Sequence, residues 1–409
     1  MRRLLGLLLL RCVVLRGEAR AVIFAEDVVP AATLLLPYFE VALDDPNKVT
    51  TVFTVANADR APHLAHVTLW TDLGVPSFAF DVYLAGYDML EVDLRLVLEG
   101  ILPQTSSTLA QQGTHSDPPV AFPACEALGT QGRLPAATVA DLRNAHTGQA
   151  SGLWGGLCGG RPIGDNLARG YVTVDVVNRC SNKFPGDPAG GADPAYFVQL
   201  GAGIASNANV LWGEFWMAER ANAFAYGDAL VHIEANGPPF PGSFTFYGRR
   251  VNGSMADNRE PLSSVHFARY LKGGVFDSGT HLLVWRDPGF VLPFGCGSTL
   301  PRLQQKEVTP FNEEEDLTDL TMGLPVGFQT RMPWAAERVN VGDDARLPIP
   351  YDSGFLYLDL DFPSAVTDPL FNRRNQSFVV SVFRAANRFA GAQRAYIQRL
   401  TNVNMHPVP

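Results

Sequence analysis

The sequence is poor in charged residues, in lysine and in long apolar runs. Only 18% of its 409 residues are charged, and four of its 32 basic residues are lysine. The net charge of −9 opposes binding to a phosphate backbone. Beyond the N-terminal segment, no run approaches the roughly 18 apolar residues of a transmembrane helix. We therefore expect no nucleic acid partner and no membrane span in the mature chain.

Glycine, proline and hydrophobic residues are abundant instead. The 38 glycines, the 30 prolines and the 46% hydrophobic content favour short strands separated by turns around a sizeable core. Phe78, Phe80, Val82 and Leu84 share one face of their segment, which is the two-residue period of a half-buried strand. Similar alternation recurs along the chain. The sequence predicts a mainly β fold with two Ig-like or β-sandwich domains, a few short helices and long loops.

The alternating segments fall into two groups. We expect an N-terminal sandwich at residues 27–100 and a second sandwich domain at 169–409, with a long loop insertion at 288–350. Residues 101–168 predict a loop-rich connector with one short helix at Thr138–His146.

Four shorter segments complete this prediction. Helical patches are expected near Met217–Phe224 and Ser264–Leu271. The runs at 355–362 and 377–383 are expected to complete the sheets of the second domain, because they are too few for a third one.

The N-terminus has the features of a signal peptide at residues 1–21. Arg2 and Arg3 precede the apolar run Leu4–Leu10, and Ala19-Arg20-Ala21 matches an A-x-A cleavage pattern. Cleavage after Ala21 and lipidation of Cys12 are alternatives, as is an N-terminal segment that is no signal at all. We expect an exported protein that is periplasmic, at the cell surface or extracellular.

Four cysteines follow the signal segment, and an even number in an exported chain suggests two disulfides. No pair has the C-x-x-C spacing of a metal site. Three pairings are open, and we prefer the one that closes the connector and ties a strand end to a distant loop. This pairing joins Cys125 to Cys158 and Cys180 to Cys296.

Carboxylates are the most plausible groups for chemistry. Asp359 and Asp361 share a face of one predicted strand, as do Glu91 and Asp93, and residues 311–319 concentrate acidic side chains that could hold Ca²⁺. No D-x-D-x-D-G loop is present, so a solubilising face is favoured and no cofactor is expected.

Histidines offer little more. His63 and His66 fall on opposite faces of their segment, and His232 with Glu234 fits a solvated face better than a ligand pair.

The densest polar segment is residues 247–262. Its charged side chains could form a ligand pocket, or they could pair with one another where a sandwich meets a loop, which we favour. The residues concerned are Arg249, Arg250, Asp257, Arg259 and Glu260.

Several segments together resemble a group of uncharacterised exported bacterial β-sandwich proteins. They read TTVFTVAN, HVTLWTDLGVPSFAFDVYLAGYDM, GYVTVDVVNRCS, NVLWGEFW, YGDALVHIEA, ADNREPL and VWRDP, and they span most of residues 33–290. The resemblance implies a bacterial, β-rich, exported protein. It supplies no catalytic residues.

Two classes of function fit these observations. The first is a non-catalytic structural or binding component of the cell envelope or of an extracellular assembly, with protein partners or self-association. The alternative is a carbohydrate-binding or glycoside hydrolase-like secreted protein, so whether the chain is an enzyme stays open. Aromatic residues that could contact a polysaccharide are Trp70, Tyr83, Tyr87, Trp212, Trp216 and Trp285.

Overall fold

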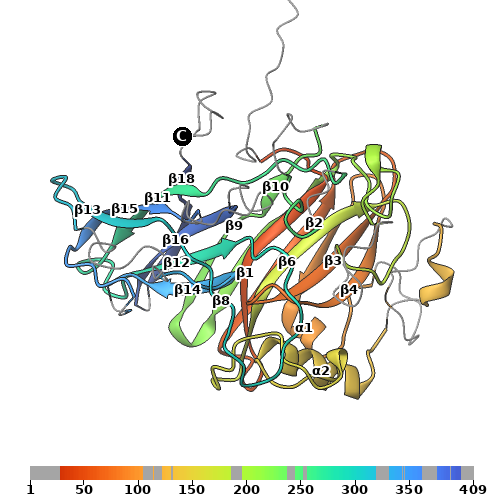
Figure 1. Ribbon diagram of the computed structural model, residues 1–409, viewed down its shortest axis with the longest axis horizontal. Coiled ribbons are helices and arrows are strands. Elements are labelled where there is room, and N and C mark those ends of the chain that lie inside the picture. Colours follow the sequence, from red (N-terminus) through yellow and green to blue (C-terminus); the bar gives the residue numbers. More distant parts are fainter. Residues whose placement is uncertain are drawn as a thin grey trace, which may run out of the picture.

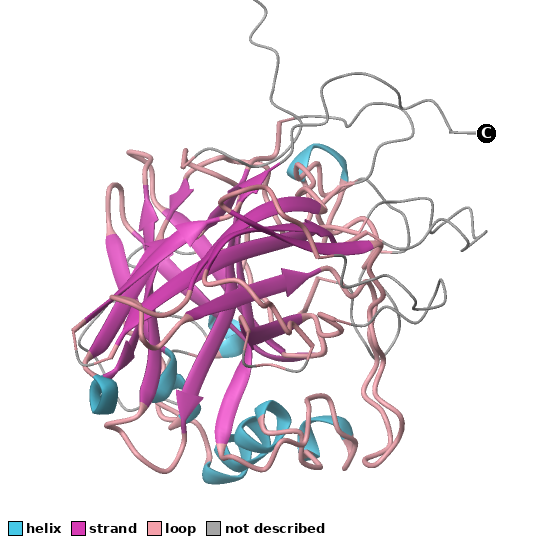
Figure 2. Ribbon diagram, turned by 90° about the vertical axis from the view of Figure 1, so that its left-hand side faces the viewer, coloured by secondary structure: helices cyan, strands magenta, loops and turns pink. Residues whose placement is uncertain are grey.

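The computed structural model shows a mainly β chain with four antiparallel sheets, which confirms the predicted fold class (Figures 1 and 2). It describes residues 28–104, 114, 122–129, 132–185, 196–236, 245–251, 256–318, 331–342, 344, 346–361, 375–386 and 388–397. The predicted signal peptide at 1–21, with Cys12, lies outside the described residues.

Two five-stranded sheets form the first pair. One has the order β10-β1-β6-β3-β4, and the other runs β5-β2-β8-β9 with β7 paired to β2. Strand β2 alternates strictly between buried and half-buried residues, as a strand with one covered face does. The bounds are β1 (Thr33–Ala42), β2 (Val49–Asn57), β3 (His63–Thr71), β4 (Pro76–Leu84), β5 (Met89–Asp93), β6 (Leu167–Val177), β7 (Leu211–Trp212), β8 (Glu214–Glu219), β9 (Phe224–Ala229) and β10 (Val231–Ile233).

Two four-stranded sheets form the second pair. Their orders are β13-β15-β11-β18 and β14-β12-β16-β17. The two late runs are strands β15 and β16, and each completes a sheet here as predicted. The bounds are β11 (Val265–Leu271), β12 (Thr280–Arg286), β13 (Glu307–Asn312), β14 (Ala336–Asn340), β15 (Ser353–Asp359), β16 (Ser377–Ala385), β17 (Phe389–Arg394) and β18 (Tyr396–Ile397).

Strand β12 joins the two pairs of sheets because both of its faces are buried. Leu283 and Trp285 belong to the large core of the first pair, whereas Leu282 and Val284 belong to the smaller core of the second. Alternate residues of a strand point to opposite faces, so one strand serves both cores. Figure 1 shows the two pairs side by side, with β1 and β8 near their junction.

Helices are few and short. Helix α2 (Ala136–His146) matches the helix predicted in the connector, and α1 (Leu94–Leu98) begins where the Asp93 side chain accepts from the Arg95 amide. Both lie at one end of the first pair of sheets (Figure 1). Single turns of 3-10 helix occur at Glu126–Leu128, Gly152–Trp154, Gln199–Gly201 and Arg220–Asn222. In the described part of the chain, no helix is long and apolar enough to cross a membrane.

The sheets cut across the predicted domain ranges. Strands β6 and β10 lie in the range expected for the second domain, yet both pair with β1. Strand β8 likewise pairs with β2. The range predicted as a loop insertion contributes β13 and β14. Backbone pairing between distant segments, which alternation alone does not reveal, assigns these strands to their sheets.

Both predicted helical patches are wrong. Ser264–Leu271 corresponds to strand β11, which pairs with β15 along its whole length. Met217–Phe224 covers the end of β8, a 3-10 turn and the first residue of β9. In both segments the inter-strand ladder satisfies the backbone and overrides the short i, i+3 pattern of apolar residues.

All four cysteines form disulfides, but the preferred pairing is wrong. The bonds join Cys125 to Cys180 and Cys158 to Cys296, with Cα atoms 4.8 and 5.1 Å apart. The Cys180 amide donates to the Pro123 carbonyl, which holds the end of β6 beside Cys125. Cys158 exchanges both backbone hydrogen bonds with Phe294 and so brings Cys296 near. Neighbouring backbone segments, not sequence proximity, decide the pairing.

Candidate functional site

The polar residues predicted at 249–260 do not converge on one site. Arg259 is buried between β1 and β6, where its Nε donates to Thr33 Oγ1 at 2.9 Å and its Nη2 lies 3.8 Å from Asp175 Oδ1. Its Nη1 donates to the backbone carbonyl of Asp257. Glu260 instead lies near the surface, where its Oε1 accepts from Asn236 at 2.9 Å. Arg259 therefore has a structural role, because its hydrogen bonds connect Thr33 on β1 with the backbone at Asp257.

Asp175 is the centre of the buried polar group around Arg259. The hydroxyls of Tyr196 and Tyr247 donate to its Oδ2 at 2.9 and 3.0 Å, and Thr33 donates to its Oδ1. Burial, reinforced by the charge of Asp175, raises the pKa of both tyrosines, so both stay protonated. These bonds join strands β1 and β6 to the segments that carry the two tyrosines.

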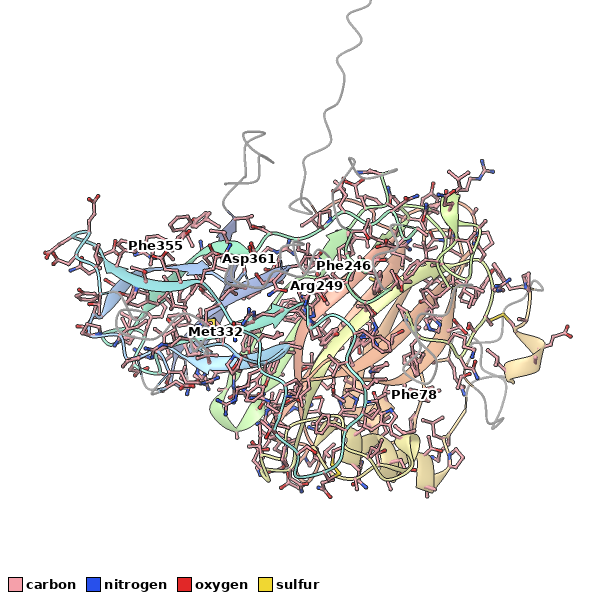
Figure 3. The ribbon with its side chains drawn as sticks, in the orientation of Figure 1. Phe78, Phe246, Arg249, Met332, Phe355 and Asp361 are labelled. Carbon is pink, nitrogen blue, oxygen red and sulfur yellow. A yellow bond between two sulfur atoms is a disulfide. The ribbon has the colours of Figure 1, made fainter. Side chains whose placement is uncertain are left out.

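Arg250 and Arg249 hold loops between the two pairs of sheets. The Arg250 guanidinium lies 4.1 Å from the centre of the Trp70 ring, and its Nη1 donates to the Gly74 and Gly289 carbonyls. Burial lowers the pKa of Arg250 to about 10, which leaves it charged at neutral pH. Arg249 donates to the Asp287 carbonyl at 2.7 Å, beside Phe246 (Figure 3).

The cavity next to Arg250 is small. Its volume of about 20 Å³ has room for about one water molecule. Its aromatic walls include Trp70, Tyr171 and Trp285. A ligand larger than a water would not fit there without movement of these rings.

The acidic and histidine side chains that the sequence offered as possible ligand groups contact other groups of the protein instead. Asp361 pairs with Lys306 at 2.8 Å, and the Asp359 carboxylate accepts from the Asp361 amide. His66 contacts Asp81 at 2.7 Å. The solvated face predicted for His232 is wrong, because this side chain is buried and contacts the Val29 carbonyl at 2.6 Å. Among the residues that the structure describes, no group of three His, Cys, Asp or Glu side chains could hold a metal ion. Ca²⁺ binding at 311–319, a segment only partly described, stays an untested alternative.

The six aromatic candidates divide by exposure. Trp70, Tyr83 and Trp285 are buried, and Trp212 is half-buried. Trp216 on β8 is 51% exposed and Tyr87 is 73% exposed. A Cβ atom added at Gly227 on the neighbouring strand would lie only 2.8 Å from the Trp216 ring, so this ring rests against the bare glycine. Of the six, Trp216 is the tryptophan that a polysaccharide could reach.

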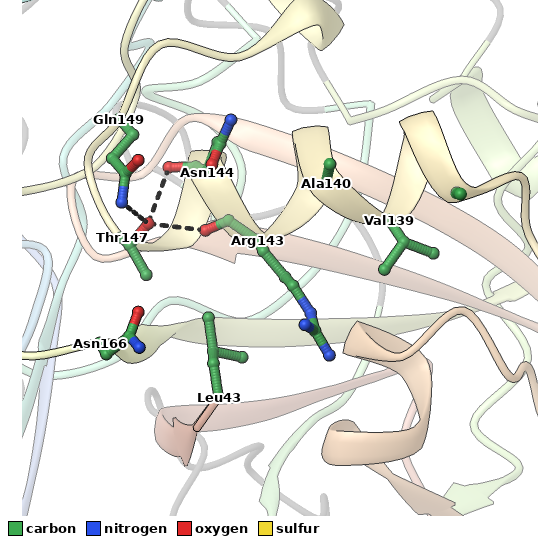
Figure 4. A pocket seen from close by; sticks show the side chains of 9 residues that line it. Leu43, Val139, Ala140, Arg143, Asn144, Thr147, Gln149 and Asn166 are labelled. Atoms are coloured by element: carbon green, nitrogen blue, oxygen red, sulfur yellow. Dashed lines mark hydrogen bonds between the residues drawn. The ribbon is translucent and has the colours of Figure 1, made fainter. Parts of the chain in front are cut away.

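A cleft of about 400 Å³ lies between helix α2 and the strand ends near Leu43 and Asn166 (Figure 4). Thr147 donates its hydroxyl to the Arg143 carbonyl at 2.9 Å, which closes the end of the helix. The guanidinium of Arg143 is the one ionisable side chain of the lining, and its Nε donates to the Leu98 carbonyl at 2.8 Å. Within the described part of the chain, the lining of this cleft therefore supplies no carboxylate or histidine as a general acid or base.

A second cavity, of about 200 Å³, is lined by charged side chains where β1 and β6 meet β14. We call it the charged pocket. It contains Glu40 from β1, although β1 is otherwise almost wholly apolar and fully buried. Glu40 lies directly opposite Arg169 on β6, and the side chains pair at 3.0 Å. The lining residues are Tyr38, Glu40, Arg161, Ile163, Arg169, Arg338, Asn340 and Asp344.

Ion pairs continue from this pocket through the junction of the sheets. Arg338 Nη1 lies 3.1 Å from Glu40 Oε2 and 3.2 Å from Glu219 Oε1, and Glu219 also pairs with Arg384 at 3.0 Å. Burial lowers the pKa of Arg338, but Glu40, Tyr38, Tyr226 and Glu219 together raise it by more, so the net shift of this pKa is upward. The chain of contacts links β6, β1, β14, β8 and β16, so charge pairing joins the two pairs of sheets. We call these residues the ion-pair network: Asp165, Arg169, Glu40, Arg338, Glu219 and Arg384.

Sequence reasoning missed this pocket. Its residues come from three short segments that lie far apart in the chain, and the one signal is a glutamate inside the apolar run TLLLPYFEVA. A charged side chain in a buried strand requires a partner of opposite charge. The position of Glu40 in the sequence therefore predicts a buried ion pair, but it does not identify the arginines that form it.

Comparisons with known proteins add little. No protein-family model and no curated protein matches the chain. Among solved structures, the chain is similar to "Enterococcal surface protein, partial N-terminal region", at 10% identity over 91% of each chain with a TM-score of 0.19. Because this score is so low, we base neither the fold nor a function on it.

Proposed function

We propose that this protein is an exported, non-catalytic structural or binding component of a bacterial cell envelope or an extracellular assembly. The two disulfides carry the proposal, because disulfides persist in oxidising compartments and are rare in the cytosol. They join residues 55 and 138 positions apart, as expected for covalent bonds that hold distant segments together outside the cell. The predicted signal peptide at 1–21 agrees with export.

The positions of the charged residues support a non-catalytic role. A general acid or base must reach the substrate, yet Asp175, Arg259 and Asp257 are buried and bonded to the fold. Among the described residues, the lining of the α2 cleft contains no carboxylate and no histidine, cysteine or lysine.

The test uses the full chain expressed in a bacterial host and recovered from each compartment. We expect it in the periplasm, at the cell surface or in the medium, with residues 1–21 removed. Light scattering and electron microscopy then show whether it assembles with itself. Protein that stays in the cytosol with an intact N-terminus would contradict the proposal, as would turnover of a polysaccharide that is lost on replacing one carboxylate without unfolding.

Trp216 favours carbohydrate binding as the second candidate function. An exposed tryptophan that rests against a glycine on a sheet surface is a flat apolar surface on which a sugar ring could stack. Retention on a polysaccharide affinity gel should fall in Trp216→Ala and stay unchanged in Tyr396→Ala, which removes a similarly exposed aromatic from β18. Equal retention of both variants and the unaltered chain would rule out Trp216 as the contact.

A further inference from the structure

We propose that the charged pocket binds a small hydroxylated carboxylate, of about the size of a sugar acid. This inference concerns the ligand of one cavity and does not depend on the export proposed above. It is based on the polar groups of the lining that the fold leaves without hydrogen bonds.

Two arginines of the pocket keep donors available. Arg161 uses its Nε for the Asp72 carboxylate, and neither of its Nη atoms forms a hydrogen bond within the described part of the chain. Arg338 uses its Nη1 for Glu40 and Glu219, and its Nε and Nη2 form no hydrogen bond with described residues. A guanidinium with two free N–H groups matches the geometry of a carboxylate.

The lining brings three arginines to one cavity. Arg161, Arg169 and Arg338 lie there with the carboxylates of Glu40 and Asp344, and Asp72, Asp165 and Glu219 pair with the arginines from outside the lining. The arginines therefore attract a ligand through their available N–H donors and not through an excess of positive charge. A single carboxylate brings less negative charge close to Glu40 than a doubly charged phosphate does.

Two further groups explain why the ligand should carry hydroxyls. Glu40 Oε2 is buried and accepts no hydrogen bond from the described residues, although Arg338 Nη1 lies 3.1 Å away. The Tyr38 hydroxyl makes no hydrogen bond in that part of the chain either. Burial, reinforced by Glu40, raises the pKa of Tyr38, so this hydroxyl keeps its proton. A ligand hydroxyl can donate to Glu40 and accept from Tyr38.

The shape of the pocket sets the size of the ligand. A bulge in β1 between Leu36 and Phe39 contains Tyr38, and bulges of this kind redirect side chains. The volume of about 200 Å³ is smaller than that of sites for drug-sized ligands and suits a group of monosaccharide size. Ile163, which is half exposed, supplies an apolar edge at the opening.

The first experiment titrates the purified full chain by calorimetry at pH 7 and low salt. The probes are glucuronate, glucose as its neutral analogue, acetate as a carboxylate without hydroxyls, and inorganic phosphate. We expect glucuronate to bind with a dissociation constant below about 1 mM and at least about tenfold more tightly than each of the others. No binding of glucuronate at this level, or phosphate binding as tightly, would overturn the proposal.

The second experiment locates the site with variants. Tyr38→Phe removes a hydroxyl that makes no hydrogen bond in the described fold, so it should leave the unfolding midpoint unchanged and weaken glucuronate binding about threefold to tenfold. Arg338→Met should weaken binding more than about tenfold. Arg388→Met is the matched control, since Arg388 is exposed and pairs with Asp277 away from the pocket. Unchanged affinity in both Tyr38→Phe and Arg338→Met, with the fold intact, would refute the assignment.

Discussion

The ion-pair network makes Glu40 the most informative residue for stability. In Glu40→Gln the side chain keeps its size, but Arg169 and Arg338 lose the carboxylate that they share. Removing one partner of a buried ion pair typically costs about 3–5 kcal/mol. Glu40 is fully buried, whereas the side chains of Arg169 and Arg338 are 11% and 26% exposed. Each arginine also keeps a second carboxylate, Asp165 or Glu219, so we expect about 3 kcal/mol.

Urea unfolding followed by tryptophan fluorescence measures this loss as a shift of the midpoint at constant slope. The control is Asp44→Asn, which breaks an exposed i, i+4 pair with Lys48 and should cost less than about 1 kcal/mol. A double-mutant cycle with Arg338→Met isolates the pairwise energy between Glu40 and Arg338. A Glu40→Gln variant no less stable than Asp44→Asn would refute the view that this network holds the sheets together.

Further predictions concern acid stability and the disulfides. Burial lowers the pKa of His146 to about 4. Below pH 6.5 the unfolded chain therefore binds a proton that the folded chain does not bind. As the pH falls from 6.5 to 4, the free energy of unfolding should decrease by up to about 3 kcal/mol. His146→Gln should flatten the melting temperature against pH in that window, and parallel curves for variant and parent would contradict this. Replacing Cys158 and Cys296 by alanine should lower the free energy of unfolding by up to about 5 kcal/mol. Replacing Cys125 and Cys180 should lower it by about 4 kcal/mol. The difference arises because closing the longer loop removes more entropy from the unfolded chain. Calorimetric or urea unfolding of the two double variants checks the order, and the reverse order would count against loop closure as the cause.

Alternation predicted the presence of several strands well, but not always their burial. Strand β4 contains the alternating residues Phe78, Phe80, Val82 and Leu84, yet both of its faces are covered and Phe78 is its one half-buried residue, whereas β2 does have one covered face. The same reasoning failed at β11, where Val265 and Ala268 mimic one turn of a helix. Its partner β15 lies far along the chain, and no local pattern reveals that pairing.

Sheet membership and disulfide pairing were beyond local patterns for the same reason. Strand β6 pairs with β1 and β3, although a long connector separates it from both. Cys158 meets Cys296 only because the backbone at Phe294 pairs beside it. These contacts are non-local, so the free energy of the whole fold selects them.

The candidate site was the least predictable part. The arginines at 249–259 formed a dense cluster in the sequence, yet in the fold they bond to distant residues such as Thr33 and Gly74. The charged pocket is assembled from Glu40, Arg169 and Arg338, which lie on three separate strands. An isolated charge in an apolar strand was the available signal, and it indicates burial with a partner without identifying that partner.

The most direct test of the central claim is non-reducing peptide mapping of the chain recovered from outside the cytosol. An exported protein with this fold should yield two cross-linked peptide pairs, one joining Cys125 to Cys180 and the other joining Cys158 to Cys296. Four free thiols in the recovered protein would contradict the proposed export into an oxidising compartment. Peptides that join Cys125 to Cys158 would contradict the fold itself.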